Sequence, residues 1–156
     1  MRYYRPATTA EAVEARAAEP LTSRILVGGT DVLVAMRHEK VKPTLLVDIK
    51  CVQDLVAPIT VDDLGINFGP TATMSDLVAH SVVRQWFPSL VEAAELVGSI
   101  AIRNRASLIG NSANGSPAAD TAPPLVALNA SVTISSVNGE RSHSLREFFL
   151  GSRRTL

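Results

Sequence analysis

The feature that most constrains the fold is a pair of short apolar runs, residues 24–27 and 44–49, with a glycine pair at 28–29 after the first run. Runs of this length and composition are typical of buried strands. The segment between them has a helical pattern, with Leu33 and Met36 on its apolar face. Because a helical crossover brings the chain back in the same direction, the two strands are predicted to be parallel.

Capping residues mark the starts of further helices. Thr8 with Glu11, and Thr73 with Asp76, have the spacing of capping boxes. Pro88 suits the first position of a helix. The predicted helices cover about residues 9–18, a stretch that starts at Thr73, residues 89–97 as far as Gly98, and residues 123–128.

Near Val56 the pattern changes, and alternating apolar residues after it predict antiparallel hairpins. The predicted hairpins join residues 59–61 to 64–68 and residues 131–135 to 140–145. We therefore expect an α+β fold of two lobes, a small parallel βαβ lobe and a mainly antiparallel lobe with helices. The expected bounds are residues 1–56 and 57–156.

Residues 102–125 contain many small and turn-forming side chains and have neither helical nor strand periodicity. Such a run predicts a long loop, and long loops in compact domains are usually functional or disordered. Disorder is not expected, because 46% of the residues are hydrophobic and only 19% are charged. A functional loop is the remaining interpretation.

Two segments have the chemistry of an anion cradle. Residues 27–31 lie between a strand and a helix that Thr30 is expected to cap, and their amides can face an anion. In the second segment, amides, hydroxyls and carboxamides come from Ser107, Gly110, Asn111, Ser112, Asn114 and Ser116. Asp120 can accept hydrogen bonds from a ribose. The alternatives are a tight turn that needs positive φ and an ordinary Ser/Asn-rich turn, but together the segments suggest a diphosphate between two lobes.

Composition excludes several classes of partner and site. Fifteen basic residues balance fifteen acidic ones, so no global field indicates a nucleic acid or a membrane surface. The single cysteine, Cys51, cannot form an internal disulfide or hold an iron–sulfur cluster by itself. The three histidines lack ligand spacing, so no metal site is expected. The N-terminal segment has no long apolar core, and we expect a cytoplasmic protein.

Several motifs resemble one family. They are VGGTD at residues 27–31, FGPTATM at 68–74, the run 93–98, IRNRASLIGN at 102–111 and ANGSPAAD at 113–120. In this order they closely resemble the FAD-binding subunit or domain of the molybdenum hydroxylases, which include the xanthine dehydrogenases and the medium subunit of carbon monoxide dehydrogenase. The resemblance implies the two-lobed FAD-binding fold shared with vanillyl-alcohol oxidase.

The resemblance also implies roles for individual residues. The FAD diphosphate would be wrapped through the backbone of Ile25, Leu26, Val27, Gly28, Gly29, Thr30 and Asp31. The cradle would be completed by Ser107, Gly110, Asn111 and Asn114, with Asp120 on the ribose or a neighbouring polar group. Val97 and Gly98 would pass close to the flavin. Arg103 and Arg105, which precede the cradle, are interpreted as solvated charges at a loop edge.

In such an enzyme the flavin takes electrons that iron–sulfur clusters carry from a molybdenum centre, and passes them to an acceptor such as NAD. The resemblance therefore implies an FAD-dependent oxidoreductase subunit with an iron–sulfur subunit and a molybdopterin subunit as partners. Because the redox chemistry belongs to the cofactor, no catalytic side chain is assigned.

Two departures from the family pattern keep an alternative open. Many members have glycine where this chain has Ile109, and a β-branched residue would be strained there if the position needs positive φ. The chain also stops at Leu156, where the family continues into a last strand and a further domain. The alternative is a truncated remnant that binds FAD weakly or not at all and acts only as an interaction module. A related enolpyruvyl reductase fits residues 102–120 less well.

Overall fold

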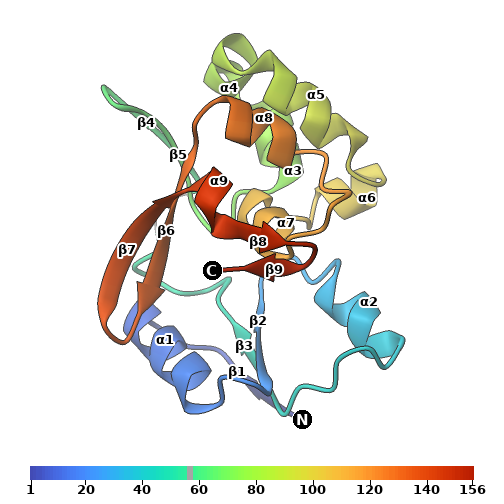
Figure 1. The fold of residues 1–156 in the computed structure, drawn as a ribbon, viewed down its shortest axis with the longest axis vertical. Helices are drawn as coiled ribbons and strands as arrows, with labels where there is room; N and C mark the ends of the chain where they lie inside the picture. The colour runs from blue at the N-terminus through green and yellow to red at the C-terminus, as the bar shows by residue number, and fades with distance from the viewer. Residues whose placement is uncertain (56–57) are drawn as a thin grey trace.

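A computed structural model describes residues 1–55 and 58–156 of the chain. The N-terminal part contains a parallel three-stranded sheet in the order β1–β3–β2 (Figure 1). Its strands are β1 (Arg2–Tyr4), β2 (Ser23–Leu26) and β3 (Leu45–Asp48). The helices α1 (Thr9–Ala18) and α2 (Val32–Arg37) follow β1 and β2. The predicted parallel pairing of β2 and β3 is confirmed, whereas β1, an exposed three-residue edge strand, carries no periodic signal.

Helix α1 has the predicted bounds because its cap forms as expected. Thr8 accepts a hydrogen bond from the amide of Glu11 at 3.2 Å, and α1 ends just before Pro20. The helix lays Ala12 against Leu45 and Val47 of the central strand, and these three buried residues make a small cluster of their own.

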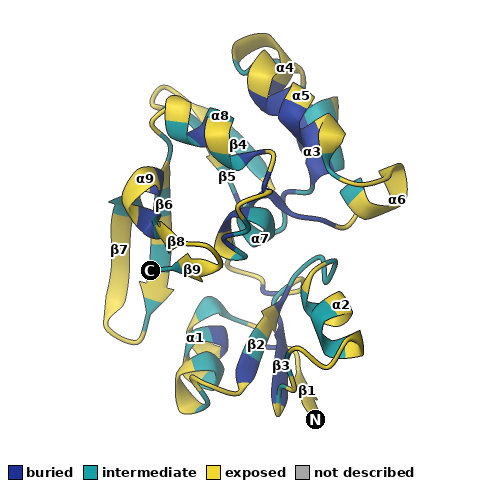
Figure 2. Ribbon diagram, turned by 45° about the vertical axis from the view of Figure 1, so that its right-hand side comes forward, coloured by how far each residue is buried: buried dark blue, intermediate teal, exposed yellow. Residues whose placement is uncertain are grey.

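Helix α2 differs from the prediction in its start and in its burial. Asp31, not Thr30, precedes its first residue, and no side chain caps it. None of its residues is buried, and the predicted apolar residue Leu33 is 48% exposed (Figure 2). The reason is local: Gly29 turns the chain with φ of 79° and accepts the first helical hydrogen bond from Leu33, which leaves α2 at the rim of the sheet.

Most of the core lies in the second part of the chain. The predicted hairpins form as β4 (Ile59–Asp62) with β5 (Gly65–Phe68), and β6 (Ser131–Ser136) with β7 (Gly139–Ser144). The helices α3 (Met74–Ala79), α4 (Ser81–Trp86) and α5 (Pro88–Leu96) group together (Figure 1). Met74, Leu77, Val83, Leu90 and Ala94 are among the buried members of this main cluster. The capping box at Thr73 and the proline start of α5 are confirmed.

The expected loop at 102–125 is interrupted by α6 (Ile100–Arg103) and α7 (Leu108–Ala113), so the prediction of an unbroken loop is wrong. Helix α8 (Ala122–Ala127) confirms the helix predicted at residues 123–128. Ser99 and Ser107 cap the first two of these helices. Because helices of four to six residues complete fewer than two turns, they leave no 3.6-residue periodicity to detect.

The chain ends in α9 (Leu145–Phe148) and a small hairpin of β8 (Phe149–Gly151) and β9 (Arg154–Thr155), which the sequence did not predict. The turn of this hairpin docks beside the end of α7, where the amide of Arg153 donates to the carbonyl of Gly115 at 2.7 Å (Figure 1). The predicted lobe boundary near Val56 lies outside the described residues, so the bounds of the two lobes stay a prediction. Among the described residues, the helices are too short and too polar to cross a bilayer.

Candidate functional site

The first of the two segments that the sequence singled out contacts the backbone that leads directly into the second. A Cβ atom added to Gly28 would lie 1.9 Å from the carbonyl oxygen of Arg105 and 3.2 Å from the Cα of Ala106. Only glycine lets the two backbones approach this closely. The turn after β2 therefore packs against the chain between α6 and α7, and in Figure 1 the end of β2 lies below α7 near the centre of the view. The space that a side chain at Gly28 would occupy is filled by the backbone of Arg105 and Ala106.

Backbone donors are the main resource of the first segment. Gly29 is in the left-handed region with φ of 79°. Its carbonyl and that of Asp31 accept bonds from α2, but within residues 1–55 and 58–156 no acceptor is found for the amides of Gly28, Gly29, Thr30 and Asp31. A row of free amides beside a helix start is suited to an anion.

The preceding residues of β2 contribute differently. The carbonyl of Leu26 accepts from the amide of Ile49 at 3.2 Å, so the polar backbone of Leu26 faces β3. Because consecutive residues of a strand face opposite sides, Ile25 presents its backbone to the open edge of the sheet. Val27 lies between the strand and the turn and is half-buried. Ile25 and Leu26 thus belong to the sheet rather than to the turn.

The second segment is held from behind by the FGPTATM motif. The amide of Met74 donates to the carbonyl of Ala106 at 2.9 Å, and the amide of Leu108 donates to the carbonyl of Ala72 at 3.0 Å. These bonds form a short antiparallel bridge between Thr73 and Ser107. The motif therefore fixes the backbone that meets Gly28.

Ser107 and Gly110 form a helix cap. The Ser107 hydroxyl accepts from the amide of Gly110 at 3.1 Å, and Ser107 is only 3% exposed. A Cβ on Gly110 would lie 2.8 Å from that hydroxyl oxygen, so glycine leaves room for the cap. Ile109 lies inside α7 without a left-handed φ, so the strain expected at this position is absent.

The two asparagines have their carboxamide oxygens engaged. Asn111 Oδ1 accepts from the hydroxyl of buried Thr121 at 2.7 Å, and Asn114 Oδ1 accepts from Arg153 Nη1 at 3.4 Å. Their NH₂ groups have no acceptor in the part of the chain that the structure describes, and they remain available as donors. Asp120 is exposed on the segment between α7 and α8.

Arg103 and Arg105 differ in a way that the sequence did not reveal. Arg103 Nη1 lies 3.0 Å from the carbonyl oxygen of Glu95 and 3.2 Å from that of Gly98. The interpretation of Arg103 as a solvated charge is therefore wrong, because its guanidinium donates hydrogen bonds to backbone carbonyls at the C-terminal end of α5. Arg105 is exposed and has no side-chain partner among the described residues. Val97 is half-buried against the main cluster, and Gly98 is exposed with φ of 51°.

Asp48 is a buried carboxylate that the sequence analysis missed. It ends β3, is 3% exposed, and accepts from the hydroxyl of Tyr3 on β1 and from Lys50 Nζ at 2.6 Å. Burial alone would raise the pKa of Asp48, but the hydrogen bonds from Lys50 and Tyr3 outweigh it and lower that pKa. A charged group at a strand end was a detectable signal, but its partners come from other segments.

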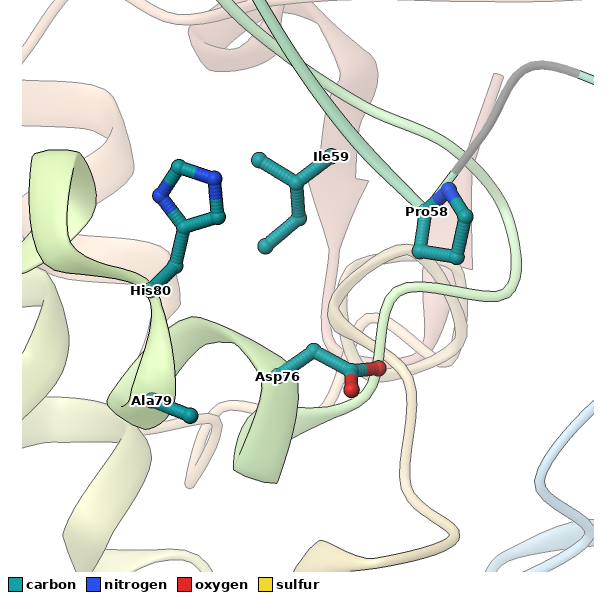
Figure 3. Close-up of a pocket in the computed structure, with 5 residues that line it drawn as sticks. All are labelled: Pro58, Ile59, Asp76, Ala79 and His80. Carbon is teal, nitrogen blue, oxygen red and sulfur yellow. The ribbon is translucent and has the colours of Figure 1, made fainter.

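A separate cavity of about 370 Å³ lies between β4, α3 and α4 and is lined by Pro58, Ile59, Asp76, Ala79 and His80. In Figure 3 the His80 ring and the Asp76 carboxylate do not point toward each other. Asp76 completes the capping box of α3, and His80 Nδ1 accepts from the amide of Val83 at 3.5 Å to cap α4. The two titratable side chains that line this cavity are therefore both engaged in helix capping. No group of three metal-ligating side chains occurs within residues 1–55 and 58–156.

A protein-family model described as the FAD-binding domain in molybdopterin dehydrogenase matches residues 1–156. The chain belongs to this family. The segments 27–31 and 102–120 are therefore parts of an FAD-binding domain, and the cofactor expected from the sequence is confirmed at the level of the family.

Curated relatives carry the same domain within longer chains. The xanthine dehydrogenase FAD-binding subunit of Escherichia coli O157:H7 is 32% identical over 149 residues, which cover 96% of this chain and 51% of that protein. The nicotinate dehydrogenase FAD-subunit of Eubacterium barkeri is 34% identical over 127 residues, 81% of this chain and 43% of that protein. The FAD-binding domain described above thus spans about half the length of the curated relatives it matches.

The fold also matches solved structures. A chain of carbon monoxide dehydrogenase from Hydrogenophaga pseudoflava, in a form that lacks the Mo-pyranopterin moiety of the molybdenum cofactor, superposes with a TM-score of 0.95 at 29% identity. The match covers 100% of this chain and 54% of that chain. The expected fold, a small parallel sheet with antiparallel sheets and helices, is therefore confirmed for the FAD-binding domain.

Proposed function

We propose that this FAD-binding domain holds the diphosphate of FAD between residues 27–31 and 107–114 and serves as the flavin-bearing part of a molybdenum-containing dehydrogenase. The observation that carries the proposal is the contact between Gly28 and the backbone of Arg105, which joins two donor-bearing segments that are far apart in the sequence. Each segment alone is an ordinary turn or helix cap. Together they give one anion two sets of donors.

The available donors fit a diphosphate. The amides of residues 28–31 lack protein acceptors in the described part of the chain, and the NH₂ groups of Asn111 and Asn114 are free in the same sense. All of these groups are hydrogen-bond donors. Backbone and carboxamide donors of this kind bind phosphate oxygens without a change in protonation. Ser107 supports this arrangement by capping α7.

We assign separate tasks to the remaining candidate residues. Val97 and Gly98 form the corner after α5, and we place them on the flavin side of the site. Asp120 is exposed and free to accept hydrogen bonds from ribose hydroxyls or a neighbouring polar group. The protein binds and orients the cofactor, and no side chain is assigned a proton transfer.

The proposed activity is that of an FAD-dependent oxidoreductase subunit in the cytoplasm. When bound, FAD would supply a redox couple able to accept electrons from an iron–sulfur partner and to reduce an acceptor such as NAD. The proposal of partners is supported by the relatives, which are named as FAD subunits or medium chains of dehydrogenases of xanthine, nicotinate and carbon monoxide. Copurification with an iron–sulfur subunit and a molybdopterin subunit would test it.

Absorption spectroscopy of the purified chain tests FAD binding directly. The chain is titrated with FAD, freed of excess ligand, and its flavin band is compared with its protein concentration. We expect occupancy near one FAD per chain. Iron and labile sulfide are measured in the same sample and are expected to be absent, because a single cysteine cannot ligate a cluster.

The alternative function, a truncated remnant that acts only as an interaction module, predicts the opposite result. A folded chain that stays colourless and cannot be reconstituted with FAD would refute the proposed function and favour a module that acts only by protein interaction. Circular dichroism of the same sample separates this outcome from misfolding. Asn111→Asp offers a further control, because a carboxylate in place of the free NH₂ donor would repel a phosphate and weaken FAD binding while α7 still forms.

A further inference from the structure

Arg103 lies outside helix α5 but caps its C-terminal end. Its Nη1 lies 3.0 Å from the carbonyl oxygen of Glu95, 3.4 Å from that of Val97 and 3.2 Å from that of Gly98. Helix α5 has no basic residue in its own last turn. Because the last carbonyls of a helix lack intrahelical partners and carry partial negative charge, a guanidinium at this point satisfies and neutralises them.

The same corner is closed by the residue before Arg103. A Cβ on Gly98 would lie 2.9 Å from Cγ2 of Ile102, so α6 packs directly onto the left-handed glycine after α5. The Ser99 hydroxyl accepts from the amide of Ile102 at 3.4 Å and caps α6. Two consecutive residues of α6 thus contact the end of α5. Ile102 packs against Gly98, and Arg103 donates hydrogen bonds to backbone carbonyls.

Helix α6 leads directly into the contact with the first segment. The amides of Arg105 and Ala106 both donate to the carbonyl of Ile102, at 2.9 and 2.7 Å. The carbonyl of Arg105 then fills the space where Gly28 lacks a Cβ. A shift of α6 relative to α5 is therefore passed along the backbone to the Arg105 carbonyl, which the bridge between Thr73 and Ser107 also restrains.

We propose that Arg103 is a positioning residue of the cofactor site: it holds α6 against the end of α5 and so sets where the second segment meets Gly28. The inference rests on the proposed function, because its binding effect is read through FAD. Arg103 touches neither segment itself. It acts through the 97–98 corner and through the backbone of Arg105.

Arg105 provides a matched control two residues away. It has the same charge and the same short helix before it, but its side chain is exposed and has no partner among the described residues. The variants are Arg103→Met, Arg103→Lys and Arg105→Met, each in the full 156-residue chain. Amide hydrogen exchange is followed over residues 97–108 and 26–34 without FAD, and FAD binding is followed by the affinity and the shape of the flavin band.

We expect Arg103→Met to speed exchange in both regions, to weaken FAD binding about tenfold and to alter the flavin band. Arg103→Lys keeps a charged donor and should recover affinity to within about threefold of the parent. Arg105→Met should stay within about twofold of the parent. If Arg103→Met does not fold, Arg103→Lys and Arg105→Met carry the test, with the lysine variant expected to show the faster exchange.

Equal FAD affinity and band shape in Arg103→Met and Arg105→Met would overturn the proposal, even if Arg103→Met melts at a lower temperature. That result would leave Arg103 a merely stabilising residue. Failure of the parent chain to bind FAD would instead refute the proposed function. The exchange data then decide alone: faster exchange over 26–34 in Arg103→Met only would support positioning, and unchanged exchange there would overturn it.

Discussion

The two glycine-bearing segments have similar compositions but use their polar groups differently. In the first segment the amides of residues 28–31 have no acceptor within the described ranges 1–55 and 58–156, and Gly29 gives the turn its left-handed backbone. In residues 107–114 most amides and the Ser107 hydroxyl are used to build α7 and its cap. Within the part of the chain that the structure describes, the free side-chain donors of the second segment include the carboxamide NH₂ groups of Asn111 and Asn114. Small polar residues therefore mark both segments, but in one they leave donors available and in the other they mainly build the support.

Gly28→Ala should have the largest effect, because it attacks the contact that joins the two segments. The new Cβ would lie 1.9 Å from a backbone oxygen that is itself fixed by the bridge between Thr73 and Ser107. We expect a loss of about 3 kcal/mol in the free energy of unfolding. FAD binding should be lost with it. Denaturant titration measures the stability, and a variant as stable as the parent would show that the segments do not pack this closely.

Gly29→Ala should lower the free energy of unfolding less than Gly28→Ala does. Together with its control, it separates the effect of backbone strain from the effect on FAD binding. A left-handed alanine at φ of 79° costs about 1–2 kcal/mol. Gly139→Ala is the control, because Gly139 has φ of 95° with open space around it and is the first residue of β7, away from the proposed site. Gly29→Ala should lose somewhat more stability than Gly139→Ala, because its new Cβ would also lie 2.9 Å from Cδ1 of Leu33, and only Gly29→Ala should weaken FAD binding. Equal affinities in the two variants would remove Gly29 from the site.

Ser107→Ala sharpens the difference between support and donor. Loss of the cap should lower the free energy of unfolding by about 1 kcal/mol. Since Ser107 is 3% exposed and its hydroxyl accepts from the amide of Gly110, FAD affinity should change by less than about threefold. Isothermal titration with FAD beside thermal melts tests this. Unchanged stability with a tenfold loss of affinity would mean that Ser107 binds the phosphate itself.

The smallest expected effect is the loss of stability in acid of the sheet formed by β1, β3 and β2, in which Asp48 ends β3. The pKa of Asp48 is lowered below its ordinary value of 3.8 in the folded chain. Its contribution to stability is therefore complete above that value and is lost as pH falls through the lower, folded pKa. Asp48→Asn should lose about 1 kcal/mol at pH 7 and flatten the stability profile below pH 4. Denaturant titrations from pH 2 to pH 7 measure this, and an unchanged acid limb would assign the dependence to other carboxylates.

The sequence predicted those features that depend on neighbours along the chain. The bounds of α1, the capping box at Thr73, the proline start of α5 and both long hairpins follow from local hydrogen bonds and short-range periodicity. The motifs also identified the family, whose model matches residues 1–156. Elements of two to six residues, such as α7, β8 and β9, were missed because they are too short to show a period.

The partners of the polar groups were decided only by the tertiary structure. Arg103 and Arg105 are alike in sequence, yet the packing of α6 on α5 gives one of them three carbonyls and leaves the other exposed. Gly28 has the signature of a phosphate turn, yet its missing side chain makes room for the carbonyl of Arg105. Sequence patterns record what a residue offers within a few positions. Which groups it meets, and which donors stay free for a cofactor, depends on distances between segments that are far apart along the chain.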